Sequence, residues 1–172
     1  MNKLELRMYG LVPYNISPIQ QGIQYGHAVV EYGNENSKNE EYKLWSKIYK
    51  TFIILNGGTT NKNVDNLGTM NQHLQTLRDN NVLCSTFFEP DLGDQLTSVV
   101  FIVDERVFNK EKWPEYDGLW YDEDGKVFTS GKWDRKPNEY EYRAWLENFS
   151  KDEKEVEKIL FLRNFLKSFR LA

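Results

Sequence analysis

The chain has 172 residues and a mass of 20.4 kDa, and 40% of its residues are hydrophobic and 15% aromatic. That composition suffices for one domain with an appendage and excludes global disorder. The net charge of −4 excludes a uniformly basic surface for nucleic acid. One cysteine and two histidines exclude an intramolecular disulfide and a metal cage rich in Cys or His, so we expect no metal and no cofactor.

The sequence also bears on location. No apolar run approaches the roughly 20 residues of a membrane-spanning helix. The N-terminus lacks the apolar core of a signal peptide. We therefore expect a cytoplasmic protein with no membrane partner.

The distribution of charged residues and of turn-forming residues divides the chain into two parts. Residues 1–86 carry 8 basic and 7 acidic side chains, whereas residues 87–172 carry 14 and 19. The second half also holds most of the Asp-Gly and proline breaks. The pattern predicts an α/β domain over residues 1–105 and, over 106–172, a hairpin and helical extension packed on it.

The first predicted element is a strand that Pro13 ends. A helix follows, with Ser17 as its cap and Pro18 at its first position, and it is expected to reach about Tyr32. Its apolar residues recur at helical spacing, which is typical of an amphipathic helix. They are Ile19, Ile23, Gly26 and Val30.

Three further strands and one helix complete the predicted domain. Residues 51–55 form a nearly continuous apolar run, which predicts a strand buried on both faces. Thr69 and Gln72 have capping-box spacing at the start of a helix that reaches residues 80–81. Strands follow at 82–88 and 96–103. This order favours a small four-stranded mixed sheet with helices packed on it, an α/β fold.

The extension has a hairpin and two helices. Apolar residues flank Asp124-Gly125, which predicts an antiparallel hairpin over residues 119–129. Pro137 precedes a predicted helix that reaches residue 149. A last helix over 152–169 carries an apolar stripe that includes Phe165 and Phe169, and this stripe packs on its own domain or forms a homodimer contact.

The first helix also carries a polar stripe. Gln20, Gln24, His27 and Glu31 are spaced i, i+4, i+7 and i+11, which places them on one side of the helix. Such a stripe can face a cleft and bind the hydrogen-bonding edges of a ligand. The alternative is a solvated or inter-helix polar face.

Two loops are further candidates. One follows the second strand and can present backbone N–H groups to an anion, although it matches no phosphate-binding motif and can equally be a plain turn. Its residues are Asn56, Gly57, Gly58, Thr59 and Thr60. The other lies between the last two strands of the domain, where carboxylates at strand ends are often placed for ligand contact, with ordinary loop polarity as the alternative. Its candidates are Glu89, Asp91, Gln95 and Thr97.

The segment from Ser17 to Ala28, with Gln24 three residues before His27, resembles the first-helix motif of the second class of peptidyl-tRNA hydrolases. The resemblance covers about the first 105 residues. It implies helices on both faces of the sheet and a cleft between the first helix and the loop before the last strand. In that family the cleft serves hydrolysis of the ester that joins a peptide to tRNA. The family's lysine position is occupied by Gln20, which cannot supply a cation.

Two functions follow as expectations. The first is a hydrolase that cleaves an ester or related bond of a tRNA-linked or nucleotide-linked substrate with His27, Gln24 and Asp91. The second is an inactive derivative that sequesters a nucleotide or small polar ligand, as a phage counter-defence protein would. The acidic balance argues against an extended nucleic-acid track in either case.

Overall fold

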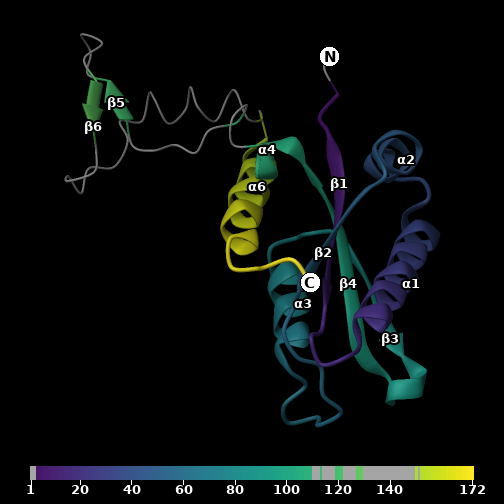
Figure 1. Cartoon of the computed structure of the whole chain (residues 1–172). Coiled ribbons are helices and arrows are strands. Elements are labelled where there is room, and N and C mark those ends of the chain that lie inside the picture. The colour runs from purple at the N-terminus through teal and green to yellow at the C-terminus, as the bar shows by residue number, and fades with distance from the viewer. Residues whose placement is uncertain (1–2, 110–112, 114–118, 122–126, 130–149, 151) are drawn as a thin grey trace. The chain divides into compact units, whose positions relative to one another are not determined.

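The computed structural model describes residues 3–109, 113, 119–121, 127–129, 150 and 152–172 (Figure 1). The chain divides into two compact units. The first comprises Met1–Glu105 together with Asn164–Ala172, and the second comprises Arg106–Arg163.

The first unit is built on a four-stranded mixed sheet, which confirms the predicted α/β fold. The strand order is β2-β1-β4-β3, where β1 is Leu6–Val12, β2 is Thr51–Asn56, β3 is Cys84–Glu89 and β4 is Gln95–Asp104. β1 pairs parallel to β2 and antiparallel to β4, and β4 pairs antiparallel to β3. The last residues of β1, β2 and β3 and the first of β4 therefore lie at one end of the sheet.

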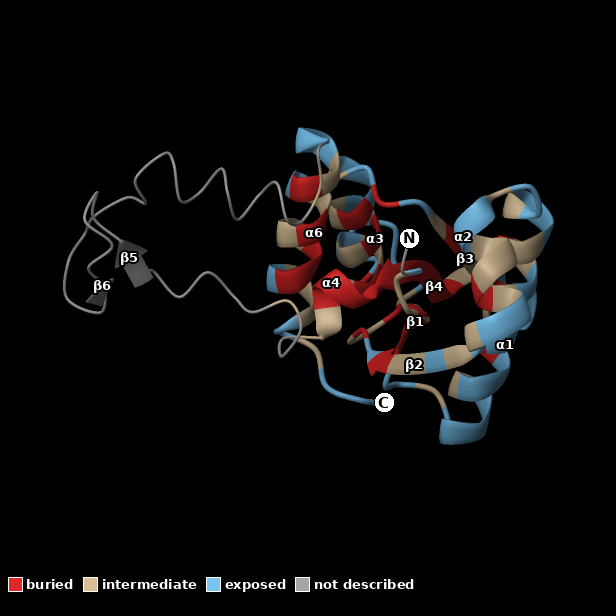
Figure 2. Cartoon of the chain, turned by 90° about the horizontal axis from the view of Figure 1, so that it is seen from above, coloured by how far each residue is buried: buried red, intermediate tan, exposed pale blue. Residues whose placement is uncertain are grey.

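Two helices cover the sheet from opposite faces (Figure 2). α1 spans Pro18–Asn36, and α3 spans Thr69–Asp79. The predicted start of α1 is confirmed, because the Ser17 side chain accepts a hydrogen bond from the Gln20 backbone N–H and Pro18 opens the first turn. α1 packs on β1, β3 and β4, whereas α3 packs on β4.

The apolar stripe of α1 faces outward. Ile19 is 78% exposed, and Ile23 and Val30 are exposed too. The side that packs on the sheet comprises Gln24, Tyr25, Ala28 and Tyr32.

The tyrosines decide this orientation. The Tyr25 hydroxyl donates to the Met8 carbonyl at 2.8 Å, so the ring is buried with its polar atom satisfied. The ring lies directly on Gly10, where a Cβ would approach Tyr25 Cε2 to 2.2 Å. A glycine in β1 thus allows α1 to bury its aromatic side instead of its aliphatic one.

Other sequence predictions also fail in detail. β2 is an edge strand in which only Leu55 is fully buried, so it is not buried on both faces. Its outer edge takes up the end of the chain, since the Asn56 N–H donates to the Arg170 carbonyl and the Ala172 N–H to the Ile54 carbonyl. This pairing covers backbone groups that an open edge would expose.

The start of α3 is not the predicted capping box. Gly68 is the N-cap residue, with a φ of 93° and no side-chain cap. Thr69 is the first helical residue, and its hydroxyl accepts from the Thr59 N–H and donates to the Gly57 carbonyl. Met70, Leu74 and Leu77 form the buried side of α3.

The segment between α1 and β2 forms two short helices that the sequence did not predict. They are α2 (Glu40–Leu44) and the π-helical turn η1 (Trp45–Tyr49). Asn39 caps α2 through the Tyr42 N–H, and Trp45 enters the core.

The second unit contains the predicted hairpin strands, β5 (Leu119–Tyr121) and β6 (Val127–Thr129), which pair antiparallel. The hairpin turn and the helix expected over 137–149 lie outside the described residues. α4 (Glu105–Phe108) follows β4, and α6 (Glu153–Leu166) forms the last helix. Arg106 donates to Glu155 at 2.7 Å, and Arg163 donates to the Arg106 carbonyl.

The last residues of the chain belong to the first unit. The His73 ring of α3 lies edge-on to Phe165 and Phe169, with centroid distances of 5.8 and 4.8 Å. Part of the predicted stripe of the last helix therefore packs on its own domain, one of the two expected outcomes, and Phe169 lies beyond the end of α6.

Candidate functional site

Gln24 is the centre of a buried polar network at the end of the sheet. Its side-chain amide donates to Glu89 Oε2 at 2.5 Å, and its Oε1 accepts from the Thr97 hydroxyl at 2.7 Å. Gln24 is only 4% exposed and Thr97 is fully buried. These contacts join α1 to both strands of the β3–β4 hairpin, and they fix which way the amide points.

A β-bulge places Thr97 within reach of Gln24. Phe87 pairs with Ser98 but Phe88 pairs with Leu96, so β4 has one extra residue at this step. A bulge changes the direction of the side chains beside it. Here the extra residue, Thr97, turns its hydroxyl toward α1.

Glu89 ends β3 and holds the turn that follows. Its Oε1 accepts from the Asp91 backbone N–H at 3.2 Å, and it caps the short 3₁₀ helix η2 (Pro90–Leu92). The hydrogen bond from Gln24, followed by that of the Asp91 N–H and the charge of His27, holds the pKa of Glu89 below its ordinary value. Glu89 is therefore ionised at neutral pH.

His27 lies beside this network on the exposed side of α1. Its ring meets the ring of Phe87 edge-on at a centroid distance of 4.4 Å. Phe87 thus orients the imidazole, and the Glu89 carboxylate lies near enough for the two side chains to interact electrostatically. We refer to Gln24, His27, Glu89 and Thr97 as the Gln24 network.

The other candidates from the sequence lie less centrally. Gln20 is exposed, one turn before Gln24, and Glu31 is half-buried further along α1. The Asp91 side chain is exposed, and its backbone N–H, not its carboxylate, joins the network. Gln95 donates to the Leu92 carbonyl at 2.6 Å and so stabilises the turn.

The loop of residues 56–60, which the sequence indicated as a candidate anion site, is not part of the Gln24 network. It follows β2, and β1 and β4 separate that strand from β3. Its groups are held within the first unit: Asn56 Oδ1 accepts from the Gly58 N–H, and the Thr60 backbone makes two hydrogen bonds with the side chain of Asn15, which lies between β1 and α1. The loop forms a structured turn at the start of α3.

Lys62, which the sequence did not single out, brings a cation to the site. A Cβ on Gly93 would lie 2.9 Å from Lys62 Cε and 3.1 Å from its Nζ. Gly93 follows η2 in the turn that Glu89 holds, so Lys62 reaches the β3–β4 turn from a loop about 30 residues earlier. Spacing along the chain gives no signal of such a contact.

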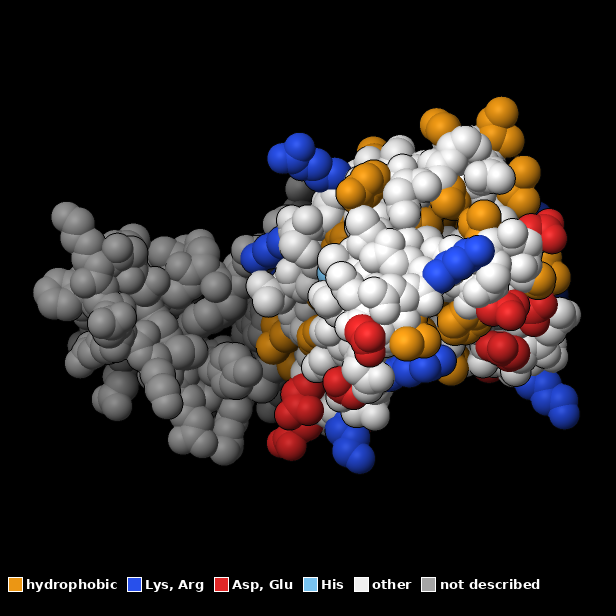
Figure 3. All heavy atoms as spheres, turned by 90° about the horizontal axis from the view of Figure 1, so that it is seen from below, with side chains coloured by type: hydrophobic (Ala, Val, Ile, Leu, Met, Phe, Trp, Pro, Cys, Tyr) orange, Lys and Arg blue, Asp and Glu red, His pale blue; other side chains and the backbone are white. Residues whose placement is uncertain are grey.

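The end of the sheet that carries these residues faces the viewer in Figure 3. Acidic and basic side chains are interspersed there, and hydrophobic side chains gather toward one side. Within the described ranges, no group of three or more His, Cys, Asp or Glu side chains is placed to hold a metal ion. The Gln24 network offers an imidazole, a carboxylate, an amide and a hydroxyl, and Lys62 adds an ammonium group at the β3–β4 turn.

No family model, curated protein or solved structure matches this chain. No helix among the described residues is long and apolar enough to cross a membrane. The geometry of the site therefore carries any functional argument.

Proposed function

We propose that this protein is a peptidyl-tRNA-hydrolase-like enzyme, which cleaves an ester by means of a water molecule that His27 activates. The observation that carries the proposal is the hydrogen-bonded chain Thr97–Gln24–Glu89, which ends beside the His27 ring. A general base needs a defined position from which it can reach the proton that it abstracts. The edge-on contact with Phe87 fixes the ring of His27, and the Glu89 carboxylate lies beside it.

The reaction has two steps. His27 takes a proton from water as the water oxygen attacks the ester carbonyl carbon. The bond to the ribose oxygen then breaks, and His27 returns the proton to that oxygen. The products are a free carboxylic acid and a free hydroxyl.

Amide and cationic groups near the network would stabilise the oxyanion of the tetrahedral intermediate. Gln24 has a second amide N–H, and Gln20 lies one turn away. Lys62 at the β3–β4 turn supplies positive charge, which the glutamine at position 20 lacks.

Ester hydrolysis by the full chain tests the proposal. With diacetyl-lysyl-tRNA as substrate, His27→Ala should lower kcat/KM about 100-fold or more, because general-base catalysis contributes about 10²–10⁴-fold. His73→Phe is the matched control, since it removes the other histidine and keeps an aromatic ring in its place. Gln20→Lys should raise the rate.

A ligand-binding function without turnover is the second candidate. It is favoured by Gln20, which is exposed and occupies the position of the lysine in the second class of peptidyl-tRNA hydrolases. An amide can hydrogen-bond to a ligand there but cannot supply a cation. In that case the wild-type chain would not hydrolyse the ester. It would instead show saturable stabilisation by a nucleotide or small polar ligand in a thermal shift experiment, and His27→Ala would reduce that stabilisation.

A further inference from the structure

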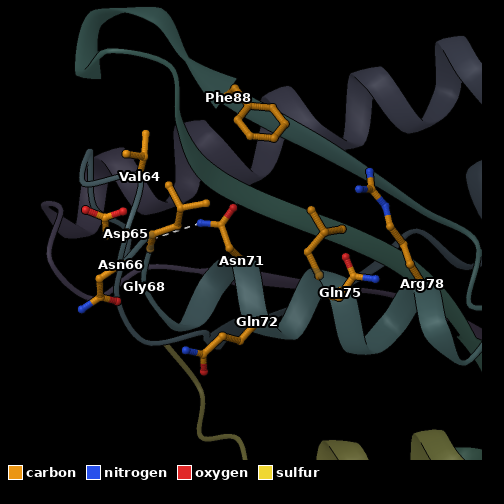
Figure 4. A pocket seen from close by; sticks show the side chains of 11 residues that line it. Val64, Asp65, Asn66, Gly68, Asn71, Gln72, Gln75, Arg78 and Phe88 are labelled. Carbon is orange, nitrogen blue, oxygen red and sulfur yellow. Dashed lines mark hydrogen bonds between the residues drawn. The ribbon is translucent and has the colours of Figure 1, made fainter.

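A separate hollow lies on the α3 side of the first unit, on the opposite face of the sheet from α1. Its volume is about 510 Å³, within the usual range for small-ligand sites. The loop over residues 64–68, the side of α3 and Phe88 of β3 form its walls (Figure 4). We refer to it as the Phe88 pocket.

Phe88 gives the pocket an aromatic wall. Successive residues of β3 point to opposite faces of the sheet, so Phe87 contacts His27 of α1 whereas Phe88 lies on the α3 side, where it is 44% exposed. Leu74, which is 5% exposed, supplies an apolar surface in the same pocket. An aromatic ring with a free face beside buried apolar surface suits a flat ligand that stacks on it.

Two amides of α3 line the pocket with fixed orientations. Asn71 and Gln75 project from α3 on the side of Phe88 (Figure 4). Asn71 Nδ2 donates to the Leu67 carbonyl at 3.0 Å, and Gln75 Nε2 donates to Asp79 at 2.7 Å. Each amide thus keeps its carbonyl oxygen and one N–H for a ligand, the pairing of acceptor and donor that reads the edge of a nucleobase.

The two ends of the pocket differ in charge. Arg78 lines it at the C-terminal end of α3, and Asp65 lines it at the loop. Asn71 and Arg78 are two turns apart, or about 10 Å along the helix. That length fits one nucleotide with its base over Phe88 and its phosphate toward Arg78, whereas Asp65 would repel further phosphates.

We propose that the Phe88 pocket binds one nucleotide, whose base stacks on Phe88 and hydrogen-bonds to Asn71 and Gln75. The nucleotide is either free or one residue of a single strand, because both present the same base and phosphate. This inference does not depend on hydrolysis at the Gln24 network.

Calorimetric titration of the full chain tests the pocket. The probes are AMP, GMP, CMP, UMP and a single-stranded RNA hexamer of mixed sequence, with ribose 5-phosphate as the probe that lacks a base. Phe88→Ala should weaken binding about tenfold or more, because stacking on an aromatic side chain contributes roughly 1–3 kcal/mol per base. Phe88→Trp should preserve it, and Asn71→Leu should reduce discrimination among the bases.

Leu83→Ala is the matched control, because Leu83 is 47% exposed close to β3 but does not line the pocket. Saturable binding of a mononucleotide that Phe88→Ala weakens and Leu83→Ala preserves would support a site for free nucleotides. The same pattern with the hexamer alone would support a site for a single strand. The proposal would be overturned by the absence of saturable binding, by equal binding of ribose 5-phosphate, or by equal effects of the two alanine variants. His27→Ala should leave nucleotide binding at the Phe88 pocket unchanged. The proposal for the pocket and the proposal of ester hydrolysis can therefore be refuted separately.

Discussion

The network around Gln24 makes a quantitative prediction for Thr97→Val. Valine keeps the shape of threonine but removes the hydroxyl that donates to Gln24 Oε1 at 2.7 Å. The substitution leaves Gln24 Oε1 without this donor in the protein interior, since Gln24 is 4% exposed. A buried polar atom left without its partner costs about 1–3 kcal/mol, so the free energy of unfolding should fall by that amount. Urea denaturation measures it as a lower midpoint with an unchanged slope.

The neighbouring residue provides the control. Ser98 is also fully buried, but its hydroxyl has no hydrogen-bond partner among the described residues. Ser98→Ala should therefore leave the stability unchanged or raise it. A second readout is the carboxyl resonance of Glu89, whose pKa should rise toward its ordinary value in Thr97→Val, because the Gln24 amide is no longer held. The reasoning is refuted if Thr97→Val costs no more than Ser98→Ala.

Three further predictions test the packing of the first unit. Ile23→Gln should change the stability by less than about 0.5 kcal/mol, whereas Leu77→Ala should cost about 2–5 kcal/mol, and equal costs in urea denaturation would contradict the outward position of the α1 stripe. Gly10→Ala should lower the stability by about 1–3 kcal/mol or more, because the new methyl would overlap the Tyr25 ring, and an unchanged melting temperature would rule this contact out. Burial lowers the pKa of His73 in the folded state below its ordinary value of 6.5. The unfolded chain therefore takes up a proton at His73 more readily than the folded chain, so the free energy of unfolding is unaffected by this residue above about pH 6.5 and decreases as the pH falls below that value. Calorimetry should show a smaller loss on acidification in His73→Phe, and an identical pH profile would argue against the buried imidazole.

The strand and helix order could be read from the sequence because each element has a strong local signal. Ser17-Pro18 marks the start of α1, and the β-branched run of β4 marks a buried strand. The side of α1 that packs could not be read, because it depends on Gly10 in another element and on a tyrosine ring with a satisfied hydroxyl. A helical pattern of aliphatic residues gives no information about such a partner.

The candidate site was partly predictable for the same reason. Gln24 and His27 are three residues apart on a helix, so their proximity follows from the sequence, although Gln24 faces the sheet and His27 is exposed. Their contact with Glu89 and Thr97 depends on how the β3–β4 hairpin docks and on a one-residue bulge. Lys62 reaches the site through a loop, and loop geometry has no periodic signal.

Hydrolysis of diacetyl-lysyl-tRNA by the full chain tests the central claim most directly. We predict turnover by the wild-type protein and by His73→Phe, and a rate at least about 100-fold lower for folded His27→Ala. Absence of turnover in the wild-type protein, or equal rates for the wild-type protein and His27→Ala, would contradict the proposed role of His27 beside the Gln24 network.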